Sequence, residues 1–121
     1  MVVDDRRALG AAGEEAVGRW YTDAGYRVVD RNWRCREGEL DLVAVRGSTL
    51  VFCEVKTRRS TAFGVPAEAV TIAKQRRLRT LAVRWLAEHG DARARELRFD
   101  VASVLATRGA EPVIDVIENA F

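Results

Sequence analysis

Three acidic side chains and a lysine lie near the ends of two neighbouring apolar segments. The stretch GELDLVAVRGSTLVFCEVK, residues 38–56, contains Glu39, Asp41, Glu54 and Lys56. Acidic residues are poor strand formers, and a buried carboxylate without a partner is costly. Either a compensating partner or a chemical role must therefore account for these positions.

A β-hairpin with its turn at residues 47–48, Gly-Ser, explains how the charges would be arranged. Glycine at the first position suits a tight two-residue turn. Counting back from that turn places Asp41 opposite Glu54, and two residues farther on Glu39 opposite Lys56. Directly opposed residues share one face of a sheet. Since both faces of the hairpin are otherwise apolar, we expect the charges at the margin of a core.

A divalent cation would turn the repulsion between Asp41 and Glu54 into binding. Carboxylate oxygens suit Mg²⁺ or Mn²⁺, which keep water ligands that a substrate phosphate can replace. Lys56 would point into the same pocket, where its ammonium can hold a phosphate oxygen or orient an attacking water. The alternative is an ion-pair ladder in which Lys56 neutralises Glu39 and Glu54 while backbone donors cap Asp41, and the pattern alone leaves both interpretations open.

The basic residues are mostly arginine, with lysine only at positions 56 and 74. The guanidinium group binds phosphate in a bidentate way. Codon bias explains the arginine excess equally well, but it does not explain the clustering. The clusters predict a nucleic-acid-binding surface made of Arg34, Arg36, Arg58, Arg59, Lys74 and Arg77.

Hydrophobic periodicity predicts helices at residues 8–24 and 67–88. It predicts strands at 26–33, 39–46, 49–56, 97–106 and 112–120. A helix between the third and fourth strands makes their pairing parallel. The expected fold is α/β, a mixed five-stranded sheet flanked by helices in the order αβββαββ, with residues 1–121 as a single domain.

Composition describes an ordinary globular protein, with 48% hydrophobic and 31% charged residues and a net charge of +2. No apolar run approaches the roughly 20 residues of a membrane helix, and no apolar leader segment is visible. Cys35 and Cys53 are expected to be free thiols, which predicts a cytoplasmic location. Asp100 is expected to pair with Arg98 on its strand.

Four motifs together resemble the small bacterial YraN-like family: GAAGEEAVGRWY, GELDLV, VFCEVKTR and RFDV, over residues 9–118. Proteins of that family are predicted endonucleases of the PD-(D/E)XK superfamily, related to archaeal Holliday junction resolvases. The resemblance implies a restriction-endonuclease-like core. It implies metal ligation by Asp41, Glu54 and the backbone carbonyl of Val55, with Lys56 as the catalytic lysine.

The resemblance also makes Glu14 the auxiliary acid of the site. A helical wheel places Glu14 on the flank of the apolar stripe, within reach of the sheet. Relatives usually carry a basic residue after the first glycine of this GxxGE segment, where this chain has Ala11 and Ala12.

The residues and the resemblance together predict a Mg²⁺- or Mn²⁺-dependent endonuclease that hydrolyses DNA phosphodiesters, in branched or otherwise structured DNA. A nucleic-acid-binding or interaction module without turnover is the alternative. Lys56 favours catalysis, because a degenerate module in a chain so poor in lysine would be free to lose it. Resolution of a junction by two symmetric cuts would require a homodimer.

Overall fold

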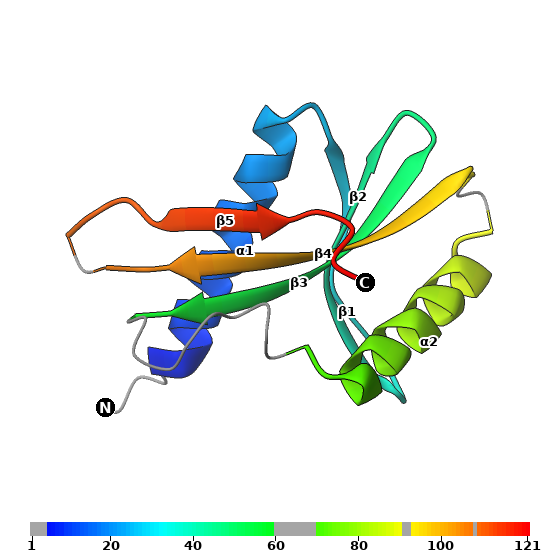
Figure 1. Cartoon of the computed structure of the whole chain (residues 1–121), viewed down its shortest axis with the longest axis horizontal. Helices are drawn as coiled ribbons and strands as arrows, with labels where there is room; N and C mark the ends of the chain where they lie inside the picture. The colour runs from blue at the N-terminus through cyan, green and yellow to red at the C-terminus, as the bar shows by residue number, and fades with distance from the viewer. Residues whose placement is uncertain (1–4, 60–69, 91–92, 108) are drawn as a thin grey trace.

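The computed structural model describes residues 5–59, 70–90, 93–107 and 109–121. Its elements follow the predicted order αβββαββ and confirm the α/β class (Figure 1). They are α1 (Asp5–Asp23), β1 (Arg27–Cys35), β2 (Gly38–Arg46), β3 (Thr49–Arg58), α2 (Ile72–Glu88), β4 (Glu96–Leu105) and β5 (Val113–Ile117).

The five strands form one mixed sheet in which spatial order follows chain order. Neighbouring strands are antiparallel except β3 and β4, which pair in parallel from Thr49–Glu96 to Arg58–Leu105. The predicted parallel pairing is confirmed, and its cause is α2, which returns the chain to the edge where β3 began. β3 also continues two residues beyond its predicted end.

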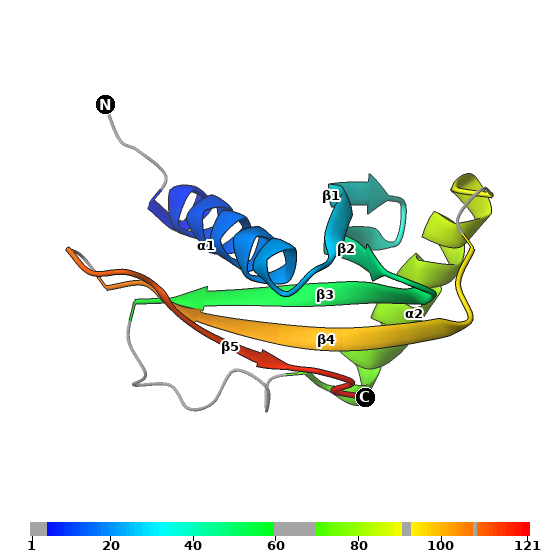
Figure 2. The ribbon, with the colours of Figure 1, turned by 90° about the horizontal axis from the view of Figure 1, so that it is seen from above.

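The sheet separates two apolar clusters, one under each helix. Val51 and Cys53 of β3 pack with Val17 and Tyr21 of α1, whereas the alternate β3 residue Phe52 packs with α2. Alternate strand residues face opposite sides of a sheet, so the two helices cover opposite faces. Figure 2 shows α1 lying along one face of β3.

The tight turn between β2 and β3 forms as predicted. Gly47 has φ 60°, while Ser48 is not among the described residues with positive φ, as a glycine-first turn requires. The strands pair from Arg46–Thr49 to Leu42–Cys53 in the predicted register.

Helix α2 begins later than the predicted residue 67. The Thr71 side chain accepts a hydrogen bond from the backbone N–H of Lys74 at 3.1 Å and caps the helix, which starts at Ile72. Val70, which falls within the predicted helix, therefore precedes the observed one, and residues 67–69 lie outside the described residues. The helix ends at Glu88 with His89 as its C-cap.

A buried carboxylate ties α1 and the C-terminal segment to β4. Asp100 accepts hydrogen bonds from Tyr21 Oη at 2.6 Å, Arg98 Nε at 2.9 Å and the Asn119 backbone N–H at 3.0 Å. The pairing predicted for Arg98 and Asp100 is confirmed. Burial and the bond to Asp100 raise the pKa of Tyr21, so its hydroxyl remains a donor that anchors α1.

Cys35 and Cys53 are free thiols, as expected. Within the part of the chain that the structure describes, no helix combines the length and apolar character needed to cross a membrane.

Candidate active site

Strands β2 and β3 separate at Asp41. Their ladder ends at Leu42–Cys53, so the pairs predicted beyond it, Asp41 with Glu54 and Glu39 with Lys56, do not form. The side chains of β2 change faces at the same point. Leu40 packs in the cluster under α2 and Leu42 in the cluster under α1, although residues two apart share a face in a regular strand.

Strand β1 is distorted at the same level. Asn32 has φ 49°, a left-handed conformation that asparagine tolerates better than most residues. Its neighbours Arg31 and Trp33 pair with Leu42 and Leu40, so Asn32 lies beside Asp41. Both strands of this hairpin therefore bend together, and the bend opens the gap beside β3.

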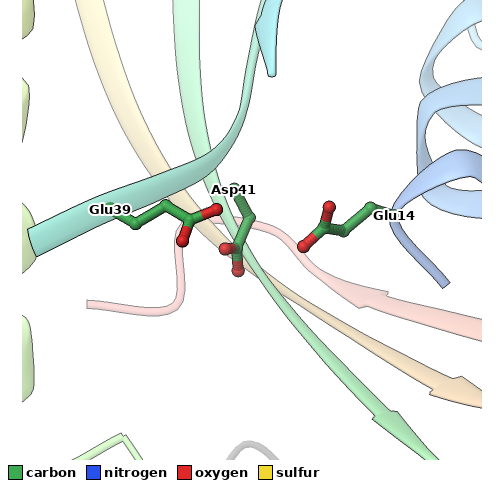
Figure 3. Close-up of side chains that lie close together, drawn as sticks. All are labelled: Glu14, Glu39 and Asp41. Atoms are coloured by element: carbon green, nitrogen blue, oxygen red, sulfur yellow. The ribbon is translucent and has the colours of Figure 1, made fainter. Parts of the chain in front are cut away.

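The Asp41 carboxylate accepts a hydrogen bond that a backbone carbonyl of β2 would accept if β2 and β3 stayed paired. Its Oδ2 accepts the backbone N–H of Val55 in β3 at 2.8 Å. In Figure 3, the Asp41 side chain extends from β2 at the point where this strand turns away from β3. A carboxylate in place of a backbone carbonyl thus bridges the gap and is fixed in orientation.

Two more acids approach Asp41 from opposite sides (Figure 3). Glu14 reaches it from α1 and Glu39 from β2, and ligand oxygens of all three lie within 4.8 Å of one another. Asn32 Nδ2 donates to Glu14 Oε2 at 2.6 Å and to Glu39 Oε1 at 3.0 Å. One amide group therefore holds two carboxylates together beside the third.

Gly13 lets α1 come close enough for Glu14 to reach the site. A Cβ atom at this position would lie 2.9 Å from Thr57 Cβ of β3, a contact too close for real side chains. The glycine of the GxxGE segment therefore sets the helix-to-sheet distance, and the next residue in the chain is the acid that faces Asp41.

Glu54 is turned toward lysines. The residue is 9% exposed, and its Oε1 lies 2.7 Å from Lys74 Nζ and 3.4 Å from Lys56 Nζ. Glu39 pairs instead with Arg34, whose Nε lies 3.3 Å from its Oε2. The ion-pair alternative is thus present in part, because Lys56 lies beside Glu54 and a backbone N–H caps Asp41, but Lys56 does not pair with Glu39. Lys74 is a partner of Glu54 that the sequence did not indicate.

These contacts move the pKa values of three groups. Burial and the charge of Glu54 raise the pKa of Asp41 to about 7, although the Val55 N–H opposes the shift. Burial and the neighbouring Lys74 lower the pKa of Lys56 despite the attraction of Glu54. Burial alone would lower the pKa of Lys74, but its contact with the Glu54 carboxylate raises it.

The predicted nucleic-acid-binding residues divide between two regions. Arg34 and Arg36 are exposed near the β1–β2 turn, and Arg77 is exposed on α2. Arg58 ends β3, and the exposed Arg59 that follows lines a hollow of about 380 Å³. Lys74 is half-buried, and its ammonium group contacts Glu54.

Asn32, Glu39 and Lys74 join the site in roles that sequence reasoning did not assign. Glu39 was recognised as a charge of the hairpin but not as a neighbour of Glu14. The left-handed Asn32 leaves no unique mark in the sequence, because asparagine occurs in many conformations. Lys74 was predicted to belong to the nucleic-acid-binding surface, and only the packing of α2 brings it to β3.

The fold and the site define an α/β protein in which carboxylates and lysines gather where two strands of a mixed sheet separate. The chain belongs to Uncharacterised protein family UPF0102, the YraN-like family, which it matches over residues 13–104.

Similar proteins share most of their length with this chain. The UPF0102 protein of Nocardia farcinica is 56% identical over 119 residues, which cover 98% of this chain and 93% of the relative. That of Beutenbergia cavernae is 65% identical over 101 residues, covering 84% and 85%. That of Frankia alni is 55% identical over 121 residues, covering 100% of both chains.

Proposed function

We propose that this protein is a metal-dependent endonuclease that hydrolyses DNA phosphodiesters. The observation that carries the proposal is the position of Asp41. Its carboxylate lies at the separation of β2 and β3, bonded to Val55 N–H, with Glu14 and Glu39 oxygens within 4.8 Å. Burial first, and then the charges of the neighbouring acids, raise the pKa of Asp41, which expresses the cost of an ionised carboxylate at this position without a cation.

The donor atoms suit a hard divalent ion such as Mg²⁺ or Mn²⁺. Asp41 and Glu14 would be its ligands, joined by Glu54 once that side chain leaves its lysines. The Val55 carbonyl would join them, since the N–H and C=O of one strand residue point to the same side and Val55 N–H faces Asp41. The ion would supply Lewis acidity toward the phosphate.

Lys56 would act directly on the reacting phosphate. It follows Glu54 by two residues on β3, and its Nζ lies 3.4 Å from Glu54 Oε1. An ammonium there can hold a non-bridging phosphate oxygen and stabilise the charge that develops during attack. Its lowered pKa, which arises from burial and from Lys74, would also favour proton exchange with an attacking water.

A cleavage panel tests the proposal. Branched, flapped, single-stranded and duplex DNA, with matched RNA, are incubated with Mg²⁺ or Mn²⁺ and the wild-type protein. We expect cleavage of branched or flapped DNA that requires the metal and disappears in Asp41→Asn. Binding without cleavage of any substrate would contradict the enzyme and support the non-catalytic module. Symmetric paired cuts in a four-way junction would in addition require a homodimer, which sedimentation measures.

A further inference from the structure

The two lysines of this sequence converge on a single carboxylate. Lys56 reaches Glu54 from the same strand, and Lys74 reaches it from α2, across the gap between helix and sheet. The contact from α2 is the shorter of the two, with 2.7 Å from Lys74 Nζ to Glu54 Oε1 against 3.4 Å from Lys56 Nζ. Glu54 is 9% exposed, so water contributes little to its neutralisation.

The position of Lys74 in its helix is unfavourable by local rules. Thr71 caps α2, so Lys74 lies in the first turn, which holds no acidic residue. A helix N-terminus carries partial positive charge and favours acidic residues. A cation there needs compensation from outside the helix, and the contact with Glu54 provides it.

We propose that Lys74 is an internal cation that holds Glu54 until a divalent ion takes its place. This inference rests on the proposed function, because it concerns the same metal site. Glu54 is outside the group of three acids whose oxygens lie within 4.8 Å, and its Oε1 faces the lysines. Completion of the metal site therefore requires Glu54 to exchange an ammonium for the metal.

The exchange would link metal binding to nucleic-acid binding. Once Glu54 ligates the metal, its charge is shared with that ion, and Lys74 Nζ becomes available to a phosphate in the same pocket. Lys74 would then contribute to DNA binding only in the metal-loaded protein. By thermodynamic linkage, DNA would strengthen metal binding by the same factor.

Calorimetric titration with Mn²⁺ alone tests the competition. Lys74→Met removes the ammonium and keeps a long flexible side chain. Arg76→Met is the matched control, because Arg76 is an exposed cation on the same helix. We expect Lys74→Met to bind Mn²⁺ about fivefold more tightly than the wild type, because the ion pair that competes with the metal for Glu54 is absent. Arg76→Met should bind Mn²⁺ with wild-type affinity. Unchanged or weaker binding in Lys74→Met would overturn the inference.

Nitrogen-15 NMR of the lysine ammonium groups gives a second readout. The chain has two lysine side chains, and the Lys74→Met variant assigns the signal that remains to Lys56. We expect Mg²⁺ to shift the Lys74 signal strongly in the wild type and not in Asp41→Asn. A Lys74 signal that stays constant while Mg²⁺ binds at Asp41 would overturn this inference alone. Absence of any binding that depends on Asp41 would overturn the proposed function as well.

Discussion

Asp41 and Val55 are joined across the point where two strands part, by a hydrogen bond of 2.8 Å from the Val55 N–H to Asp41 Oδ2. In a continuous ladder, a backbone carbonyl of β2 would accept this bond. Here the Asp41 carboxylate accepts it. One group therefore satisfies the hydrogen bonding of β3 and also places a charge in the candidate site. Structural and chemical roles of Asp41 are therefore separable only by substitutions that keep the acceptor.

Asparagine at position 41 keeps an acceptor for Val55 N–H and removes the charge. Because the pKa of Asp41 is raised from 3.8 to about 7 in the folded protein, the folded state binds a proton more tightly than the unfolded chain. This contribution to stability is therefore complete below about pH 4 and is lost as the pH rises through about 7. Asp41→Asn has no such carboxylate and should not lose stability in this way. Above pH 7 we expect its free energy of unfolding to exceed that of the wild type by a few kcal/mol, since one pKa unit corresponds to about 1.4 kcal/mol.

Denaturant titrations of both proteins between pH 4 and 8, in the presence of a chelator, measure the difference. Identical pH dependence of the two unfolding free energies would contradict the assignment of the raised pKa to Asp41. Added Mn²⁺ should stabilise the wild type increasingly above pH 7, because ligation requires the deprotonated carboxylate.

Gly13→Ala should displace α1 from the sheet. The new Cβ would lie 2.9 Å from Thr57 Cβ, which belongs to a strand and cannot easily retreat. Overpacking of this kind costs about 1–3 kcal/mol, which exceeds the helix propensity gained from alanine. We expect a lower free energy of unfolding and weaker Mn²⁺ binding, because Glu14 moves with the helix.

Gly18→Ala in the same helix is the matched control. A Cβ there would meet the Arg31 guanidinium, the end of a flexible side chain, which can move aside. Wild-type stability and Mn²⁺ affinity in Gly13→Ala would contradict this prediction, because they would show that the space between α1 and β3 accommodates a Cβ atom at this position.

Asn32 has a backbone role and a side-chain role that two variants separate. Asn32→Gly keeps the left-handed φ of 49° without strain but removes the amide that holds Glu14 and Glu39. Asn32→Ala removes the amide and also strains the backbone by roughly 1 kcal/mol or more. We expect both to weaken Mn²⁺ binding and only the alanine variant to lose clear stability. Equal stability of the two would argue that the bend in β1 does not depend on this residue.

Lys56 should matter for cleavage and little for DNA affinity. Lys56→Ala should abolish turnover, because the ammonium acts at the reacting phosphate and not along the wider backbone. Lys56→Arg should also be impaired, since a planar guanidinium does not replace a compact ammonium. The single-turnover cleavage rate and the DNA affinity of each variant, measured under the same conditions, test this prediction. Full turnover in Lys56→Ala would show that the lysine serves only as a counterion of Glu54.

Arg58 and Arg59 should contribute to DNA binding through phosphates. On duplex DNA each neutralised phosphate adds about −0.9 to the slope of log affinity against log salt. About four to six contacts would give a slope on the order of −4 to −5. Replacing both arginines with alanine should reduce its magnitude by about 2 and weaken all sequences alike. Affinity that does not respond to salt would exclude this surface and the nucleic-acid partner.

The sequence by itself determined what is local in this protein. The order of helices and strands follows from hydrophobic periods. The β2–β3 turn follows from glycine at position 47, whose φ of 60° few other residues adopt readily. Glu39, Asp41, Glu54 and Lys56 could be read directly from an alternating apolar pattern that they interrupt, whereas Glu14 was indicated by the family resemblance.

Only the tertiary structure decided how the candidate site is assembled. Leu40 and Leu42 pack under different helices, and the pairing of β2 with β3 expected beyond Leu42 does not form. The same packing sets Asn32 between two glutamates and brings Lys74 to Glu54. These relationships depend on how two helices press on opposite faces of one sheet, and no period or turn rule within a segment encodes a contact between distant segments.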